Sequence, residues 1–357
     1  MTPIPDFRLA LDAEGEAEVL RTLRSGQVAV GPDIEHFEEA LAHQAGVAAA
    51  VAVSSGFSAL HLALIALGVG EGDEVLMPCV STCAAIRNAA IAVGAVPVFA
   101  DTNRFDFNLD PESARERITS RTRAIIAPHH TGIVSRIDLL NALGIPVIED
   151  CAQAIGASLH GNPVGSLSTL SVFSFYATKM LTTVDGGAVA GDRTDLIATV
   201  RDRRYYGGSW DSTLRFNYKM QNLGAALGRV QLRNLKHSIE RRRLIGGIYA
   251  RALVDAGAPP ETVVQGAEGA VVFRFAFRVA SGRRPMVLAA LEREGIPGRP
   301  EVGFLTPDRS AFPAAERLAS ETVTLPTYPA LTDEEVGSIA ATLTRVLRSE
   351  AHWTLPS

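Results

Sequence analysis

Residues 49–67 read Ala-Ala-Val-Ala-Val-Ser-Ser-Gly-Phe-Ser-Ala-Leu-His-Leu-Ala-Leu-Ile-Ala-Leu. The opening run of small and β-branched apolar residues predicts a buried strand over residues 49–54. A turn of small residues follows, and the apolar run after it predicts a helix over residues 58–67. A strand that is apolar on both faces and leads directly into a helix is the building unit of a parallel α/β sheet.

The same alternation continues downstream of this unit. Strands are predicted over residues 73–78, 96–101, 123–129 and 145–150, and helices over 82–93, from Pro111, and over 136–143. Two further strands are predicted over 169–175 and 187–191, and a long helix over 223–253. The fold class is therefore α/β, with a mostly parallel sheet that helices cover on both faces.

The C-terminal part of the chain predicts a second, smaller α+β unit. It has candidate strands over residues 271–280 and 322–325, a candidate helix over 285–294, and a capping box, Thr332–Glu335, that opens a final helix. We therefore predict an N-terminal arm and large domain over residues 1–235 and a smaller domain over residues 236–357.

Composition narrows the possible partners and compartment. The chain has 34 basic and 39 acidic residues, a net charge of −5, and no block of like charge, so no nucleic-acid partner is expected. No apolar stretch has the length or position of a signal peptide or a membrane span, which predicts a cytoplasmic protein without a membrane partner. Cys79, Cys83 and Cys151 lack a metal-binding spacing and are predicted to be buried free thiols.

Three clusters of polar or small residues follow predicted strands, where parallel sheets bind ligands. The turn at Ser54–Ser58 places backbone N–H groups at a helix N-terminus, which suits a phosphate, although an N-capping serine alone gives the same pattern. Asp150 ends a strand and either pairs with a ligand or caps a helix. Lys179 follows Ser171–Thr178 and is either a desolvated nucleophile or a solvated loop residue.

The order of the three clusters is more informative than any one of them. A small-residue turn, then Asp-x-x-Gln, then Ser-x-x-x-x-Lys is the order in which a chain of the pyridoxal-5′-phosphate (PLP) fold supplies a phosphate cup, a pyridinium partner and a Schiff-base lysine. The sequence resembles the DegT/DnrJ/StrS-type aminotransferases, PLP enzymes best known for aminating keto sugars carried by nucleotides. The resemblance rests on Ser54–Leu64, Gly72–Val75, Glu149–Ala157, Phe173–Lys179, Asn217–Met220 and Gln231-Leu232, and runs from Ser25-Gly26 to the final helix.

The resemblance implies fold type I of the PLP-dependent transferases and assigns catalytic roles. Lys179 would form the Schiff base and later move a proton between the substrate and the cofactor. Asp150 would pair with the pyridine nitrogen and keep it protonated, and Gln153 would hydrogen-bond the ring hydroxyl oxygen.

The resemblance also implies how the cofactor phosphate is held. Ser174 and the backbone at Gly56 and Phe57 would bind it, and Asn217 would reach the phosphate of a neighbouring subunit. Two shared active sites in a homodimer are therefore expected.

The sequence departs from the family pattern at several positions. Phe57 replaces the usual threonine, and Thr82 lies where an aromatic side chain normally stacks on the cofactor ring. Val184-Asp185 replaces Gly-Glu, and Lys219 replaces arginine. Residues 299–305 read Arg-Pro-Glu-Val-Gly-Phe-Leu in place of a His-Tyr-Pro-like segment. These changes lie on the substrate side of the expected site, so we expect an acceptor that differs from the commonest nucleotide 4-keto-6-deoxyhexoses.

Three functions fit these residues. The first is transfer of an amino group from glutamate or glutamine to a keto sugar or keto-cyclitol, in the biosynthesis of amino sugars or antibiotics. The second is a PLP-dependent dehydratase or aromatising enzyme of the same family, and the third is a PLP-binding regulatory protein.

His129 aligns with a histidine common in the family and either borders the active site or has a structural role. Arg241-Arg-Arg243 is interpreted as a solvated helix face.

Overall fold

The computed structural model describes residues 3–207, 210–264, 269–348 and 353. The helices are α1 (Ala13–Ser25), α2 (Pro32–Ala45), α3 (Gly56–Ala66), α4 (Ala85–Ala92), α5 (Pro111–Arg117), α6 (Ile137–Asn141), α7 (Thr194–Arg203), α8 (Asn222–Arg233), α9 (Leu235–Asp255), α10 (Arg284–Arg293), α11 (Pro313–Glu321) and α12 (Asp333–Leu347), with 3-10 turns at His130–Gly132 and Pro260–Thr262. The strands are β1 (Ala49–Val53), β2 (Glu74–Pro78), β3 (Val80–Ser81), β4 (Val96–Ala100), β5 (Thr122–Pro128), β6 (Val147–Asp150), β7 (Ser158–Leu159), β8 (Asn162–Pro163), β9 (Leu170–Ser174), β10 (Gly187–Gly191), β11 (Val263–Val264), β12 (Arg274–Arg278), β13 (Gly303–Phe304) and β14 (Thr322–Pro326).

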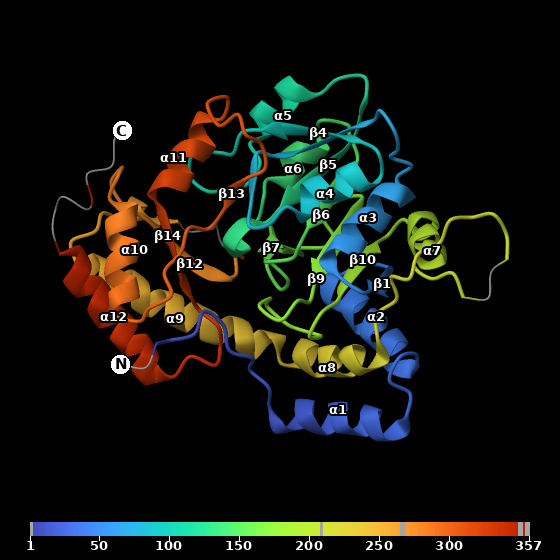
Figure 1. The fold of residues 1–357 in the computed structure, drawn as a ribbon, viewed down its shortest axis with the longest axis horizontal. Coiled ribbons are helices and arrows are strands. Elements are labelled where there is room, and N and C mark those ends of the chain that lie inside the picture. The colour runs from blue at the N-terminus through green and yellow to red at the C-terminus, as the bar shows by residue number, and fades with distance from the viewer. Residues whose placement is uncertain (1–2, 208–209, 265–268, 349–352, 354–357) are drawn as a thin grey trace.

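The main sheet has the strand order β1-β10-β9-β6-β5-β2-β4 (Figure 1). The pairs from β9 to β4 are parallel, whereas β10 runs antiparallel to both of its neighbours. The predicted α/β class with a mostly parallel sheet is confirmed. Strand β10 differs because the chain returns from β9 through a loop and not through a crossover helix.

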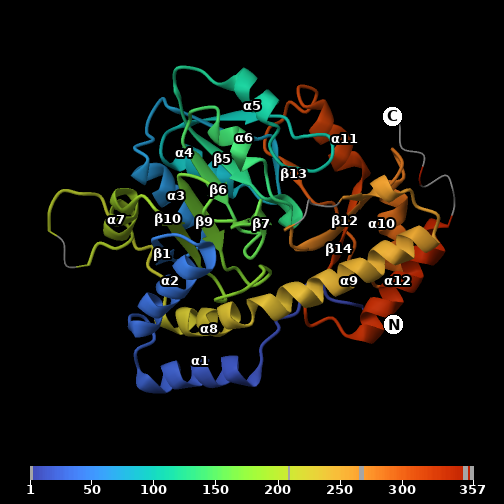
Figure 2. The ribbon, with the colours of Figure 1, turned by 180° about the vertical axis from the view of Figure 1, so that it is seen from behind.

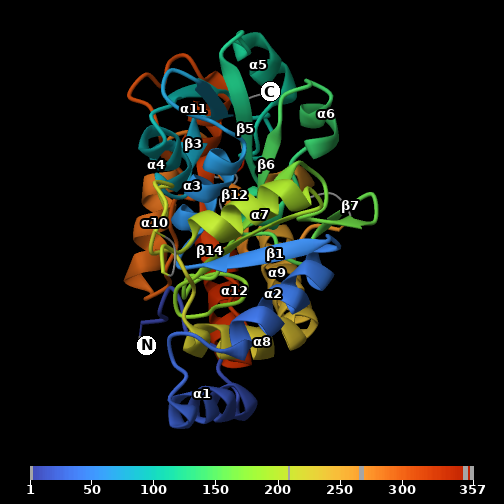
Figure 3. The ribbon, with the colours of Figure 1, turned by 90° about the vertical axis from the view of Figure 1, so that its right-hand side faces the viewer.

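Helices cover both faces of this sheet, as the continuously apolar strands predict. One apolar core joins the sheet to α2 and α8, with Phe37 and Leu41 fully buried, and a second joins its other face to α3, α4 and α7, around Leu62 and Leu64. Figure 3 shows the edge strand β1 facing the viewer, with α7 on one side and α2 on the other.

A second sheet, β11-β12-β14, is antiparallel and packs with α9, α10 and α12 around its own apolar core. Figure 2 shows α9 running from the end of α8 toward this sheet. The predicted helix over residues 223–253 is in fact two helices, α8 and α9, because helical geometry is interrupted at Asn234. The side-chain amide of Asn234 donates a hydrogen bond to Asp12 at 2.7 Å. The division into domains at residue 235 stays a prediction.

Three local predictions from the sequence can be compared with the structure: a helix cap, a helix start and the burial of the cysteines. The capping box of α12 is confirmed, with Thr332 and Glu335 each bonded to the other's backbone N–H. Helix α4 begins at Ala85 and not at residue 82, because Thr82–Ala84, which follow strand β3, form a bend and a turn, and Thr82 lines the cavity described below. All three cysteines are free, but Cys83 is exposed, so the prediction of three buried thiols is wrong at that position.

Candidate active site

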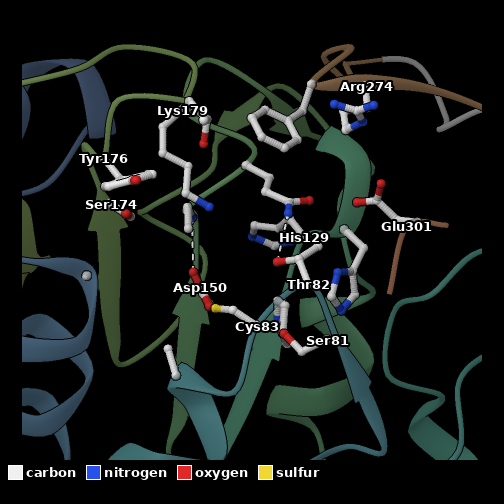
Figure 4. Close-up of a pocket in the computed structure, with 18 of the residues that line it drawn as sticks. Ser81, Thr82, Cys83, His129, Asp150, Ser174, Tyr176, Lys179, Arg274 and Glu301 are labelled. Carbon is white, nitrogen blue, oxygen red and sulfur yellow. Dashed lines mark hydrogen bonds between the residues drawn. The ribbon is translucent and has the colours of Figure 1, made fainter. Parts of the chain in front are cut away.

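A cavity of about 600 Å³ opens between the carboxyl ends of the main-sheet strands and the second sheet (Figure 4). Segments far apart in the sequence form its walls: the N-terminus of α3, the ends of β6 and β9, strand β12, and residues 299–303. The predicted site residues that line it are Gly56, Phe57, Thr82, Asp150, Gln153, Ser174 and Lys179. The structure thus brings together all of the predicted residues except Asn217.

The N-terminus of α3 and the end of β9 form an anion cradle at one side of the cavity. Ser55 caps the helix by accepting from the Ser58 N–H at 3.1 Å, while the first N–H groups of a helix have no acceptor within it. A Cβ atom added at Gly56 would lie 2.8 Å from the Cβ of Ser174, so glycine is needed for this approach. A helix N-terminus beside a serine hydroxyl fits a phosphate group.

Asp150 lies at the end of β6 on the floor of the cavity. One carboxylate oxygen accepts from the Ala152 N–H at 3.0 Å. Burial raises the pKa of Asp150, and the nearby Lys179 and His129 oppose that rise. A carboxylate in this position gains from a cation that approaches from the cavity, which fits a protonated pyridine nitrogen.

Lys179 extends into the same cavity from the loop after β9. Its backbone N–H donates to the Tyr176 carbonyl at 2.9 Å, which closes a tight turn and directs the side chain inward (Figure 4). Its ammonium nitrogen lies 5.5 Å from the centre of the Phe273 ring. No salt bridge to Lys179 occurs in the part of the chain that the structure describes, so its amine is available for a carbonyl ligand.

Gln153 is held in one orientation by two threonines. Its carbonyl oxygen accepts from the Thr131 N–H at 2.7 Å, and its amide nitrogen donates to the Thr82 hydroxyl at 3.2 Å. The donating end of the amide therefore faces the cavity, as a bond to a ring oxygen requires. Thr82, at the position of the usual stacking ring, is part of this hydrogen-bonded group.

His129 both borders the cavity and serves the structure, so both interpretations of this residue hold. Its Nδ1 accepts from the Ser135 N–H at 3.0 Å, which leaves Nε2 to donate to Glu149 at 2.9 Å. Glu149 is fully buried and also accepts from the N–H groups of Gly165 and Leu167. The network fixes the end of β6 and thereby the position of Asp150.

The far wall holds charged residues that the sequence analysis missed. Arg242 is 3% exposed and lines the cavity, so the interpretation of Arg241-Arg-Arg243 as a solvated face is wrong for its central residue. The missed signal is the spacing of Ile239, Arg242, Ile245 and Tyr249, which places Arg242 on the buried face of α9. Arg274, Glu301 and Asp6 line the cavity as well.

Asn217 lies outside the cavity lining and is exposed, and its side-chain oxygen accepts from Lys219 at 2.8 Å. Its predicted contact with a neighbouring subunit stays a prediction.

Among the residues described, no helix is long and apolar enough to cross a membrane.

Comparisons with known proteins identify the family. The sequence model of the DegT/DnrJ/EryC1/StrS aminotransferase family matches residues 10–344. The chain is 32% identical to a GDP-perosamine synthase of Caulobacter vibrioides, with 97% of this chain and all of the relative covered. A Streptococcus pneumoniae protein named as a sugar aminotransferase, in its PMP form, superimposes with a TM-score of 0.90 at 26% identity over 96% of this chain and 97% of that one. A 3-amino-5-hydroxybenzoic acid synthase superimposes with a TM-score of 0.87 at 26% identity, over 97% and 99% of the two chains. The predicted resemblance is thus confirmed: the chain belongs to the DegT/DnrJ/EryC1/StrS aminotransferase family and is a PLP-dependent aminotransferase.

Proposed function

We propose that this enzyme moves an amino group from glutamate or glutamine to a keto sugar carried by a nucleotide, or to a related keto-cyclitol. One observation carries the proposal: Lys179, Asp150, Ser174 and the N-terminus of α3 all line the same cavity. The names of the relatives, a GDP-perosamine synthase and a sugar aminotransferase, support a sugar acceptor.

Each residue of the cavity has a defined task in this proposal. Lys179 would hold PLP covalently, and its amine would serve as the base that moves the proton of the donor's α-carbon. Asp150 would keep the pyridine nitrogen protonated through an ion pair. Gly56, Phe57 and Ser174 would bind the phosphate through backbone N–H groups and a hydroxyl. When bound, PLP supplies a ring that withdraws the electrons of the bond broken at the α-carbon.

Reduction of the PLP-loaded protein tests the anchor directly. Sodium borohydride is expected to abolish the cofactor's visible absorbance and to attach the cofactor irreversibly to Lys179, which peptide mapping locates. A label on another lysine, or none, contradicts the assignment. Addition of L-glutamate to the unreduced protein is then expected to convert the bound cofactor to its pyridoxamine form.

The same spectrum separates the alternatives. Because a 3-amino-5-hydroxybenzoic acid synthase has the same fold, the spectrum also tests the dehydratase or aromatising alternative raised by the sequence. Such an enzyme, or a PLP-binding regulatory protein, would not complete a cycle in which glutamate converts the cofactor and a keto sugar restores it. A panel of GDP-, UDP- and TDP-linked keto sugars with cyclitol ketones then identifies the acceptor. Because Phe57, Thr82 and residues 299–305 depart from the family pattern, we propose that kcat/KM favours an acceptor other than the common 4-keto-6-deoxyhexoses.

We further propose that the protein acts as a cytoplasmic homodimer, in which Asn217 binds the phosphate of the partner's cofactor. The segment that precedes Asn217 exposes large apolar side chains: Tyr206 is 56% and Trp210 98% exposed. Large apolar side chains left exposed are typical of a surface that a partner covers. A fully active monomer in sedimentation experiments contradicts the proposal.

A further inference from the structure

Arg242 is a buried cation without an acidic partner. Its Nη1 donates to the Phe273 carbonyl at 3.0 Å, and its Nε has no hydrogen-bond partner. No carboxylate forms a salt bridge with it among the residues that the structure describes, although the side chain lines the cavity. Leaving a guanidinium buried and unpaired costs free energy, so an anion that enters the cavity gains by meeting it.

The residues around Arg242 do not neutralise its positive charge. Arg274, 9% exposed, and Arg299 both form ion pairs with the same carboxylate, that of Asp6 in the N-terminal arm. Glu301 is 8% exposed, and one of its carboxylate oxygens has no hydrogen-bond partner. Figure 4 shows Arg274 and Glu301 on the wall that faces Lys179. Three guanidinium groups thus share this wall with two carboxyl groups.

The position of Arg242 relative to Lys179 suits a small substrate. The Lys179 nitrogen lies 5.5 Å, and the Arg242 guanidinium carbon 6.0 Å, from the centre of the same Phe273 ring. The two groups therefore lie at most 11.5 Å apart, a span that an amino acid with a second carboxylate at the end of its side chain, such as glutamate, can bridge. A guanidinium matches a carboxylate in shape, because its N–H groups donate to both oxygens.

We propose that Arg242, supported by Arg274, binds a carboxylate of the amino donor. This inference rests on the proposed function, since it assigns the donor's place in the same cavity. The diphosphate of a sugar nucleotide fits this wall less well, because its two charges would lie beside the carboxylates of Asp6 and Glu301. Asp6, on Arg274 and Arg299, shows that this wall already accepts a carboxylate.

The test compares two substitutions on α9 in the PLP-loaded protein. Arg242→Gln removes the proposed contact. The control Arg243→Gln removes a neighbouring arginine that also bonds a backbone carbonyl, that of Ala270 at 2.9 Å, but lies outside the cavity lining. The concentration of L-glutamate that half-converts the cofactor spectrum should rise at least about tenfold in Arg242→Gln and stay unchanged in the control. Reaction with hydroxylamine, which has no carboxylate, should be equal in both.

Two further measurements separate this inference from its rivals. Arg242→Lys keeps the positive charge but lacks the planar guanidinium group. The glutamate concentration that half-converts its cofactor spectrum is expected to lie between the values for the wild type and for Arg242→Gln. If Arg242→Gln instead raises the KM of the keto-sugar nucleotide and leaves glutamate unaffected, the anion is the acceptor's diphosphate and the inference is wrong. An unchanged response to both substrates in a variant that melts like the wild type also overturns it.

Calorimetric titration with glutarate, a dicarboxylate without an amine, keeps the inference testable without turnover. Glutarate is expected to bind the wild type and Arg243→Gln and to lose most of its affinity in Arg242→Gln. If glutarate behaves so while neither glutamate nor glutamine converts the cofactor, the carboxylate site stands and the proposed function fails. Equal binding to all three proteins, or none to the wild type, contradicts the carboxylate site itself.

Discussion

The buried carboxyl group of Glu301 provides a prediction that depends only on the fold. Burial raises its pKa from an ordinary 4.5 to about 7, although Arg274, Arg299 and Lys179 all oppose the rise. Between these two pH values the folded protein keeps a proton that the unfolded chain releases, so the free energy of unfolding falls as pH rises through this window. The interval between the two pKa values corresponds to roughly 3 kcal/mol, which is fully lost above pH 7.

Glu301→Gln replaces the carboxyl group with an uncharged side chain of the same shape and should remove this loss. The variant should match the wild type near pH 4.5 and exceed its stability by up to about 3 kcal/mol at pH 8. Urea unfolding monitored from pH 4.5 to 9 measures the difference, with the exposed Glu71→Gln as control. A stability difference between variant and wild type that is the same at every pH refutes the assignment of a raised pKa to Glu301.

Three further experiments test the site and its surroundings. Asp150→Asn should retain PLP, judged by absorbance, but lose turnover by on the order of a hundredfold or more, because an amide cannot keep the pyridine nitrogen protonated; near-normal kcat contradicts that role. Mixing inactive Lys179→Ala with an Asn217→Ala variant that binds PLP weakly should restore part of the activity, since each mixed dimer has one complete site; activity that stays at the sum of the separate variants argues against sharing. Val184 has a φ of +75°, a backbone region that favours glycine, so Val184→Gly should raise the free energy of unfolding by about 0.5–1 kcal/mol, measured in urea; Val184→Ala, which keeps the Cβ atom, should gain less, and a larger gain for Val184→Ala than for Val184→Gly would contradict backbone strain at this position.

The half of the site on the main sheet could be predicted from sequence because its residues follow predicted strands in the order of a PLP-fold chain. Asp150, Ser174 and Lys179 each come at or just after the end of an apolar strand, and β6 and β9 are parallel neighbours. Carboxyl ends of parallel strands meet at one edge, so residues distant in sequence come together there. The strand and helix order of the large unit could be predicted for the same reason.

No local pattern specifies the opposite wall, and only the family resemblance indicated that residues 299–305 lie on the substrate side of the site. Residues 299–303 reach the cavity because β13 pairs with β3, with Gly303 opposite Ser81, and two-residue strands give no periodic signal. Asp6 arrives through the N-terminal arm, whose Ile4 N–H donates to the Gly295 carbonyl at 2.8 Å. Only Arg242 had a readable signal, its spacing from buried residues on α9, and the neighbouring arginines obscured it.

Thr82 shows why a departure from a family pattern is not simply a loss. Compared position by position, threonine in place of an aromatic residue removes a stacking contact worth on the order of 1 kcal/mol. In the folded chain the Thr82 hydroxyl instead accepts from the Gln153 amide, and Thr131 holds the other end of that amide. Where the family resemblance implies a ring stacked on PLP, this chain would have a smaller side chain that holds Gln153 in place. A smaller residue at position 82 with Gln153 still oriented would suit the differently shaped acceptor that we propose.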